Sequence, residues 1–287
     1  ISAQVTRMIS LAQLQRIEFN STELVSLLTD EEFSYHRAGR WMDDHVVFTF
    51  QAVILYLATI FSLKQWMKER EPFKLRLPVA IWNFSIALVS GVCAAAMTPE
   101  YFASTFNKGF YASLCSTRDT FYSGGNGLAV FVLLFARLPE FIDTLFIVLR
   151  KQPLLFIHYY HHAFTLCFTW FTYSGAFPSA RHAIYVNALI HTVMYSYYFL
   201  TTLNIRPPPI VARCITIAQI VQFVYILYAL THLTVLSHVL EVPCQIDTKS
   251  IALTWIMDLS YLYLFVDFYL NKYKGVKKTT EKAKKIE

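Results

Sequence analysis

Seven long apolar stretches alternate with short polar segments along this chain. They cover about residues 45–65, 77–97, 126–149, 153–173, 182–203, 210–236 and 251–270. Each is close to the roughly 20 residues that an α-helix needs to cross about 30 Å of hydrocarbon. A span outside a closed barrel must satisfy its backbone hydrogen bonds internally, so helices are expected. The pattern therefore predicts an all-α integral membrane protein with seven transmembrane helices.

Composition supports a membrane location for the whole central region. Of the 287 residues, 55% are hydrophobic and only 15% are charged, whereas about a quarter of an ordinary soluble domain is charged. The first forty residues show no basic region followed by an apolar core, so no cleavable signal peptide is expected. We divide the chain into a lumenal N-terminal segment (1–44), a seven-helix transmembrane domain (45–270) and a basic cytosolic tail (271–287).

The distribution of lysine and arginine predicts the orientation in the membrane. With a lumenal N-terminus, the cytosolic segments hold 16 of these residues and the lumenal segments 8, which agrees with the positive-inside rule. The tail holds seven lysines and two glutamates, typical of a solvated segment beside an anionic leaflet and not of a nucleic-acid-binding domain. Lys284 and Lys285 form a dilysine retrieval signal, which predicts a multi-pass protein of the endoplasmic reticulum with a cytosolic C-terminus.

Two further features depend on this orientation. Cys115 and Cys244 both lie in lumenal loops, an oxidising compartment, and we predict a disulfide between them. The five cysteines of the chain show no metal-ligand spacing. Asn20 begins an Asn-Ser-Thr sequon that a lumenal N-terminus would expose to glycosylation.

The fourth apolar stretch contains three histidines, His158, His161 and His162. Residues i, i+3 and i+4 of an α-helix fall on one face, so the three imidazoles share a single stripe. Ionisable groups at this depth in a bilayer are costly and usually face a protein interior or a wet cavity. The stripe is therefore a candidate active site.

Other polar residues occur at a similar depth in neighbouring spans. Counting 1.5 Å per residue from the predicted span ends places them in one layer of the cytosolic half of the bilayer. Salt bridging between Arg137 and Glu140, and hydroxyl groups joining helices, are the simpler explanations. Together these residues predict a polar active-site chamber open to the cytosol. Pro139 is expected to kink the third span. The residues of the chamber are Arg137, Glu140, Asp143 and Thr144; Asn187, His191, Met194, Tyr195 and Tyr198; and Thr216, Gln219 and Gln222. Asp258 and Asp267 are the acidic residues of the seventh span.

Imidazole can act as a general base, a nucleophile or a metal ligand. Membrane desaturases and hydroxylases also use His-x-x-His-His boxes, but they need several boxes to hold two irons, and the other histidines here form no second box. A metal-dependent membrane lipid desaturase or hydroxylase is the alternative interpretation, because the same box occurs in those enzymes, but the number of candidate ligands here is too small for two irons. A seven-helix receptor is a weaker alternative, because buried charged residues in one layer and a retrieval signal argue against it.

At these residues the chain resembles the ELO family of very-long-chain fatty acid elongases of the endoplasmic reticulum. The resemblance covers about residues 45–273. The family's Lys-x-x-Glu-x-x-Asp-Thr motif appears with arginine in place of lysine, and four more motifs follow in order. The matching residues are Arg137, Glu140, Asp143 and Thr144; His158, His161 and His162; Asn187, His191, Met194, Tyr195, Tyr197 and Tyr198; Thr216, Gln219 and Gln222; and Leu264, Phe265, Phe268 and Tyr269.

The resemblance implies a 3-ketoacyl-CoA synthase, which joins a long-chain acyl-CoA to malonyl-CoA with loss of CO₂ and CoA. No tightly bound cofactor or metal is expected. We expect His161 to take the acyl group as nucleophile, His158 and His162 to orient it or exchange protons with it, and His191 to serve the malonyl-derived half. Supporting hydrogen bonds are expected from Arg137, Glu140, Asp143, Asn187, Tyr195, Gln219 and Gln222.

The resemblance also implies partners. Basic residues at the cytosolic mouth are candidates to hold CoA phosphates, although positive-inside charge explains them equally well: Arg150, Lys151, Arg206 and Arg213. The acyl tail is expected to run from this layer toward the lumen. Membrane lipids and the ketoacyl reductase, dehydratase and enoyl reductase of the elongation cycle are the expected neighbours, and no nucleic acid is expected.

Overall fold

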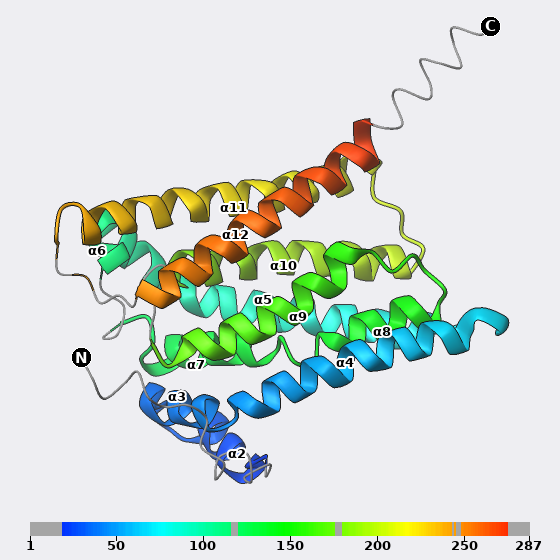
Figure 1. Ribbon diagram of the computed structural model, residues 1–287, viewed down its shortest axis with the longest axis horizontal. Helices are drawn as coiled ribbons and strands as arrows, with labels where there is room; N and C mark the ends of the chain where they lie inside the picture. The colour runs from blue at the N-terminus through cyan, green and yellow to red at the C-terminus, as the bar shows by residue number, and fades with distance from the viewer. Residues whose placement is uncertain (1–18, 116–119, 176–179, 243, 245–247, 275–287) are drawn as a thin grey trace, which may run out of the picture.

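Long helices lying side by side make up this protein (Figure 1). The computed structural model describes residues 19–115, 120–175, 180–242, 244 and 248–274, and within these ranges the regular structure is entirely helical. The long helices are α4 (Val46–Trp66), α5 (Arg76–Phe102), α9 (Phe156–Tyr173), α10 (Ala180–Thr202), α11 (Pro209–His238) and α12 (Thr248–Tyr269). Shorter ones are α2 (Ser21–Thr29), α3 (Tyr35–Asp44), α6 (Phe110–Cys115), α7 (Gly124–Phe135) and α8 (Phe141–Leu149). Single turns extend α4, α5 and α12 at Met67–Glu69, Ala103–Asn107 and Leu270–Lys274.

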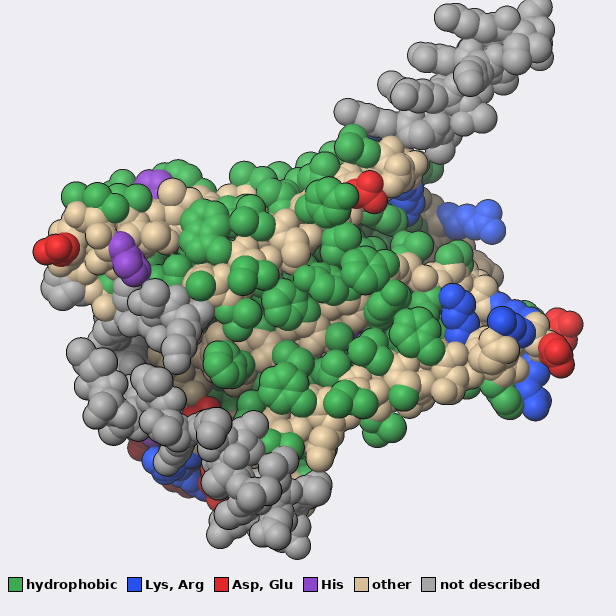
Figure 2. All heavy atoms as spheres, in the orientation of Figure 1, with side chains coloured by type: hydrophobic (Ala, Val, Ile, Leu, Met, Phe, Trp, Pro, Cys, Tyr) green, Lys and Arg blue, Asp and Glu red, His purple; other side chains and the backbone are tan. Residues whose placement is uncertain are grey.

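The apolar surface of the bundle is that of a membrane protein. Four described segments, Val46–Glu69, Arg76–Asn107, Pro209–His238 and Ser250–Tyr273, are long and apolar enough to cross a bilayer. Large hydrophobic side chains cover much of the face seen in Figure 2, as on a surface that contacts lipid. The chain is therefore a helical, multi-pass membrane protein.

The two ends of the bundle differ in chemistry. At the basic end, which carries the exposed residues Lys68, Arg70, Lys151 and Arg206, α4, α8, α10 and α12 end and α5, α9 and α11 begin. Figure 2 shows lysine and arginine side chains gathered on this side of the molecule. At the other end, which we call the disulfide end, Cys115 and Cys244 are joined by a disulfide across a sequence separation of 129.

The sequence predicts one kinked helix for the third apolar stretch. The structure instead has two separate helices there, α7 and α8. Between them the chain makes tight turns, in which Leu138 N–H donates to Phe135 C=O and Phe141 N–H to Leu138 C=O. Pro139 lacks the N–H that an α-helix would need here, and its ring excludes the carbonyl of the preceding turn. Arg137 and Glu140 therefore lie in the connection, and not on a helix face.

Helices α5 and α10 pack antiparallel along most of their length. The two helices pack tightly at Gly91 of α5, where a β-carbon would lie 3.3 Å from the side-chain Cγ2 of Thr192 on α10. At the basic end, the Arg76 guanidinium donates to the carbonyls of Thr202 (3.0 Å) and Leu203 (2.6 Å), which satisfies the free carbonyls at the end of α10. This pair forms one wall of the site described below.

The N-terminal helices α2 and α3 belong to the same core as the bundle. Trp41 and Met42 of α3 are buried with Phe131 of α7 and Trp170 of α9. The Trp170 indole also donates to the Met42 carbonyl at 2.7 Å. These contacts fix the N-terminal helices against α7 and α9.

A buried ion pair holds the disulfide end together. The Arg181 guanidinium, 1% exposed, lies 2.9 Å from Oε1 of Glu100 and also donates to the Ser113 carbonyl at 2.5 Å. Beside it, His182 contacts the Ser113 hydroxyl at 2.9 Å and the Tyr225 hydroxyl at 2.8 Å. Helices α5, α6, α10 and α11 are thereby tied to one another at this end.

Candidate active site

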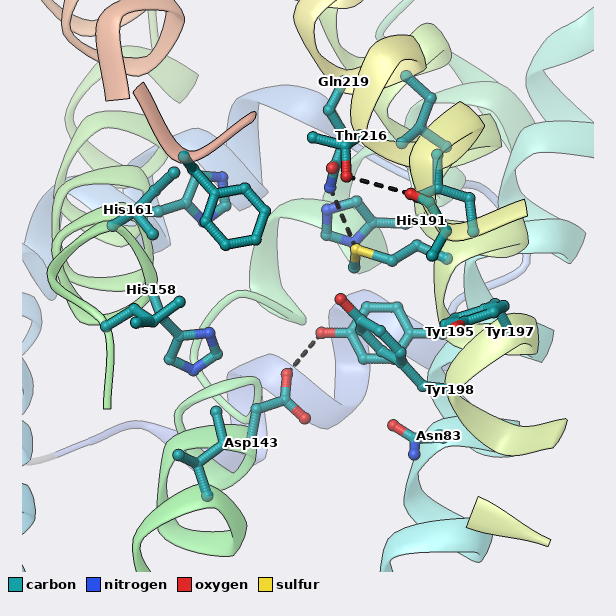
Figure 3. A pocket seen from close by; sticks show the side chains of 18 of the residues that line it. Asn83, Asp143, His158, His161, His191, Tyr195, Tyr197, Tyr198, Thr216 and Gln219 are labelled. Carbon is teal, nitrogen blue, oxygen red and sulfur yellow. Dashed lines mark hydrogen bonds between the residues drawn. The ribbon is translucent and has the colours of Figure 1, made fainter. Parts of the chain in front are cut away.

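A cavity of about 670 Å³ lies between α5, α8, α9, α10, α11 and α12 and reaches the basic end of the bundle. In Figure 3, His158 and His161 project from one side of this space and His191 from the other. Most of the residues that the sequence singles out line it: Asp143, His158, His161, His162, Asn187, His191, Met194, Tyr195, Tyr198, Thr216, Gln219 and Gln222. Arg137 and Glu140 lie behind this surface and contact the histidines, as described next.

Arg137 is the centre of a buried polar cluster. It is 6% exposed, and its Nη1 lies 3.0 Å from Oε2 of Glu140 while its Nη2 donates to Oδ1 of Asn187 at 2.9 Å. Nη1 also lies 3.3 Å from both ring nitrogens of His191. A guanidinium is always a cation and a donor, so Nη1 can donate to only one of these nitrogens, the one that carries no proton. The cluster therefore fixes the position of the His191 ring beside Arg137.

Glu140 faces two histidines but is bonded to neither. Its Oε1 lies 3.7 Å from Nδ1 of His191, and its Oε2 lies 4.0 Å from Nδ1 of His162. Both distances exceed those of a hydrogen bond. The carboxylate is 2% exposed and adds negative charge beside the two rings, which favours any positive charge that they acquire during a reaction.

His158 is oriented by a chain of hydroxyl groups. Its Nε2 lies 3.0 Å from Oγ1 of Thr144, which in turn lies 2.7 Å from the hydroxyl of Tyr56 on α4. The His158 and His162 rings are 4.4 Å apart between centroids. Thr144 is fully buried, so this orientation does not depend on solvent.

Asp143 joins three helices. Its Oδ1 accepts from the indole of Trp82 on α5, and its Oδ2 accepts from the hydroxyl of Tyr195 on α10, each at 2.5 Å. The Tyr195 bond is drawn in Figure 3. With both oxygens bonded, Asp143 serves to position Tyr195 at the cavity wall.

His161 and His162 are the two site histidines whose ring nitrogens make no hydrogen bond within the described residues, whereas His158 and His191 contact Thr144 and Arg137. The two differ in that the His162 ring faces Glu140 at 4.0 Å, while His161 has no ion-pair partner among these residues. Its ring packs against Tyr261 with centroids 4.9 Å apart. An imidazole with a free nitrogen in a cavity is the arrangement that nucleophilic attack requires.

A second, smaller cavity of about 100 Å³ begins at the same histidine. It shares His161, Asn187, Gln222 and Phe223 with the larger cavity and extends toward the disulfide end, where Tyr173 and Ala180 line it. His161 therefore lies where the two cavities meet. A molecule that reacts at His161 has room on both sides of it.

The basic residues predicted at the mouth do not all reach the cavity. Arg150 lines it, together with Gln152 and Lys272, which the sequence analysis did not select. Lys151 instead donates to the Lys68 carbonyl at 3.1 Å, and Arg213 to the Tyr269 hydroxyl at 2.9 Å. Arg206 is exposed in the loop before α11 and does not line the cavity.

Sequence reasoning missed several residues that complete the site. Trp82 and Tyr56 hold Asp143 and Thr144, and Tyr261 covers His161. Aromatic residues are frequent throughout this chain, so nothing in their spacing sets these three apart. Asn83 also lies at the cavity wall.

The predicted glycosylation site does not line the cavity. Asn20 is exposed, and its side chain caps α2 by accepting from the Glu23 N–H at 3.0 Å. Lys284 and Lys285 lie outside the described residues. In the part of the chain that the structure describes, no three His, Cys, Asp or Glu side chains are grouped closely enough to hold a metal ion.

Comparison with known proteins assigns the family. The profile of the ELO (GNS1/SUR4) family matches residues 41–283. The chain is 39% identical over 263 residues to long chain fatty acid elongase 1 of Caenorhabditis elegans, covering 91% of each chain. It is 36% identical over 262 residues to that organism's long chain fatty acid elongase 2, covering 91% of this chain and 95% of the relative. Very long chain fatty acid elongase 6 of Gallus gallus is 32% identical over 259 residues, covering 90% and 95%. The chain belongs to the ELO family.

Proposed function

We infer that this protein is the condensing enzyme of fatty acid elongation. It joins a long-chain acyl-CoA to malonyl-CoA, releases CO₂ and CoA, and gives a 3-ketoacyl-CoA two carbons longer. The observation that carries this conclusion is the family match over residues 41–283, which includes every residue that lines the large cavity. The relatives' names specify fatty acid elongation, and the histidine-lined cavity suits an acyl transfer.

We propose that the reaction proceeds in two steps through an acyl-histidine. A neutral ring nitrogen of His161 attacks the thioester carbonyl, the carbon–sulfur bond breaks, and CoA leaves as the thiol after taking a proton from the ring or a neighbouring one. Malonyl-CoA then loses CO₂, and the resulting enolate carbon attacks the acyl carbon as the carbon–nitrogen bond breaks. The departing ring nitrogen takes up a proton from solvent or from a neighbouring imidazole, which restores neutral His161. The free ring nitrogens of His161, and its position between two cavities, support this role.

The Arg137 cluster is suited to the malonyl-derived half. Negative charge develops on the thioester oxygen when malonyl-CoA loses CO₂, and donors fixed in advance stabilise such charge. His191 lines the cavity and is held by Arg137, whose guanidinium lies directly behind it. We assign His191 to bind or protonate this oxygen, and Arg137, Glu140 and Asn187 to position it.

The other polar residues are assigned to orient the reacting histidines and the bound thioesters. His158 is held by Thr144 and lies beside His162, so it exchanges protons with the reacting ring or fixes its neighbour. Asp143 positions Tyr195. The Gln219 amide donates to the Met194 sulfur at 3.3 Å, and Gln222 lines both cavities; we assign both amides to hydrogen bonding with the bound thioesters.

The mouth at the basic end is proposed to receive CoA. Arg150 and Lys272 line the cavity there and offer positive charge to phosphates. Lys151, Arg206 and Arg213 surround the same end and would add to its positive potential. The acyl tail would then occupy the second cavity, on the other side of His161.

We further propose a seven-span topology in the endoplasmic reticulum membrane, with the basic end cytosolic and the disulfide end lumenal. The lysine and arginine distribution and the disulfide both favour this orientation. In this topology α7 and α8 together form one span. The retrieval signal at Lys284 and Lys285, glycosylation of Asn20 and neighbouring enzymes of the elongation cycle belong to the same proposal.

The test is product formation by the purified protein. Malonyl-CoA is supplied with saturated acyl-CoAs of 16 to 20 carbons, with and without a strong chelator, and beside His161→Ala. A 3-ketoacyl-CoA product that survives the chelator and disappears in the variant supports the proposal. Activity that is abolished by chelator and restored by metal would favour a metal-dependent lipid oxidase instead.

A second measurement addresses the acyl-histidine. The protein is incubated with acyl-CoA alone, and its intact mass is recorded. A mass increase of one acyl group, which is absent in His161→Gln and is discharged by adding malonyl-CoA, is expected. If the adduct persists in His161→Gln, another residue carries the acyl group.

A further inference from the structure

A buried carboxyl group faces the second cavity, where an acyl tail would lie. Asp258 of α12 lines this cavity and is 1% exposed, and its Oδ2 has no hydrogen-bond partner among the residues that the structure describes. Arg137 lines the same cavity, but its guanidinium is bonded to Glu140 and Asn187. The carboxyl group is therefore available to a ligand.

A second polar atom in this cavity is also unsatisfied. The hydroxyl of Tyr173, at the other end of α9 from the histidines, is buried and has no hydrogen-bond partner in the described part of the chain. Four threonines line the cavity too: Thr165, Thr169, Thr172 and Thr254. Thr169, Thr172 and Thr254 donate to backbone carbonyls of their own helices, and Thr165 is paired with Tyr261.

Such a lining does not suit an unsubstituted hydrocarbon chain. A buried polar group without a hydrogen bond is costly, and a buried carboxyl group is among the most costly. Methylene groups neither donate nor accept, so a plain acyl chain leaves Asp258 and Tyr173 unsatisfied. A chain that carries a hydroxyl group beside Asp258 would satisfy its carboxyl group, because a hydroxyl both donates and accepts.

We propose that the second cavity binds acyl chains that carry a hydroxyl group, which hydrogen-bonds to Asp258, with Tyr173 as a second contact. The substrate class is therefore a hydroxyacyl-CoA. This inference rests on the proposed condensing activity and specifies its acyl substrate.

The structure also indicates where along the chain the hydroxyl lies. The Tyr261 hydroxyl lies 3.3 Å from the His161 carbonyl, and Asp258 is one turn earlier on α12, about 4.5 Å along the axis. The hydroxyl group therefore belongs several bonds from the thioester, and not at the methyl end of a long chain.

The experiment compares substrates and variants in one assay. Hexadecanoyl-CoA and a series of hydroxyhexadecanoyl-CoAs, with the hydroxyl moved stepwise along the chain, are each supplied with malonyl-CoA. Wild type is compared with Asp258→Leu, Asp258→Asn and Tyr173→Phe. Asp267→Leu is the matched control, because Asp267 is an exposed carboxylate on the same helix that lines neither cavity.

We expect wild type to elongate at least one hydroxy isomer with a kcat/KM equal to or above that for the unsubstituted chain. The measured quantity is the kcat/KM for the hydroxy substrate divided by the kcat/KM for the unsubstituted substrate. Asp258→Leu should lower this ratio about ten- to hundredfold, mainly by lowering the kcat/KM for the hydroxy substrate. Asp258→Asn, which keeps a hydrogen-bonding group, should restore much of it. Asp267→Leu should leave the ratio unchanged.

Two results would overturn the inference. One is a wild-type enzyme that elongates hexadecanoyl-CoA but rejects every hydroxy isomer. The other is an Asp258→Leu variant that changes both substrates equally, because a purely structural role predicts that. In either case the condensing activity stands, whereas the absence of a 3-ketoacyl-CoA from every substrate would refute the proposed function itself.

Discussion

The hydroxyl of Tyr195 donates to Oδ2 of Asp143 at 2.5 Å, and this bond fixes α10 to α8 at the wall of the large cavity. The Trp82 indole occupies the other carboxylate oxygen. Three helices that are far apart in the sequence thus meet at one side chain. Loss of one of these hydrogen bonds should lower the free energy of unfolding substantially, because it leaves a buried carboxylate oxygen unsatisfied.

Tyr195→Phe is therefore expected to lower kcat about tenfold or more and to destabilise the protein by about 1–3 kcal/mol. The measurements are steady-state condensation and thermal unfolding in detergent. Tyr263→Phe is the control, since Tyr263 is 72% exposed on α12. Equal behaviour of the two variants would show that the Asp143 contact contributes nothing.

Substitution of Arg137 separates charge from geometry. Arg137→Lys keeps a cation beside Glu140 but cannot also hold Asn187 in the same planar arrangement. We expect it to lower kcat about tenfold, with little change in the thermal midpoint. Arg137→Met leaves Glu140 buried and unpaired, and should destabilise the fold by about 3–5 kcal/mol.

The readouts are again kcat and the unfolding midpoint, compared with Arg70→Met. Arg70 is exposed and stacks on Trp66 at 3.8 Å, outside the cluster. An Arg137→Met protein as stable as wild type would contradict the burial of an ion pair at this position.

The disulfide between Cys115 and Cys244 closes a loop of 129 residues. Replacing both cysteines with serine should destabilise the protein by about 2–5 kcal/mol, because the unfolded chain gains freedom. The thermal midpoint and the gel mobility with and without reductant measure this. Cys214→Ser, at an exposed free thiol, should change neither, and full alkylation of Cys115 and Cys244 without reductant would refute the bond.

Gly127 of α7 is required by close packing. A β-carbon there would lie 2.3 Å from the carbonyl oxygen of Tyr122 and 3.0 Å from Cδ1 of Phe33. Gly127→Ala should therefore cost at least about 1–3 kcal/mol, despite the better helix propensity of alanine. Gly125→Ala, with open space at the same point, should be neutral or stabilising. A Gly127→Ala variant with an unchanged midpoint would contradict this packing.

Much of the architecture could be predicted from the sequence. Six of the seven apolar stretches each coincide with one described helix, because long apolar runs leave the backbone few alternatives to internal hydrogen bonding. The third is divided between α7 and α8, and Pro139 within it predicts a kink at the place where the chain turns between them. The periodicity of α9 also puts His158, His161 and His162 on one face, since helix geometry is local.

The tertiary structure decided which of these residues meet. Helical spacing cannot show that Arg137 reaches Asn187 or that Thr144 lies between His158 and Tyr56, because these contacts join residues on different elements. For the same reason it cannot show that the His161 ring makes no hydrogen bond or ion pair within the described residues. Nor does it show the second cavity with Asp258 at its wall. The sequence by itself determined the helices and the set of polar side chains, and packing between helices decided which are paired and which are left free to react.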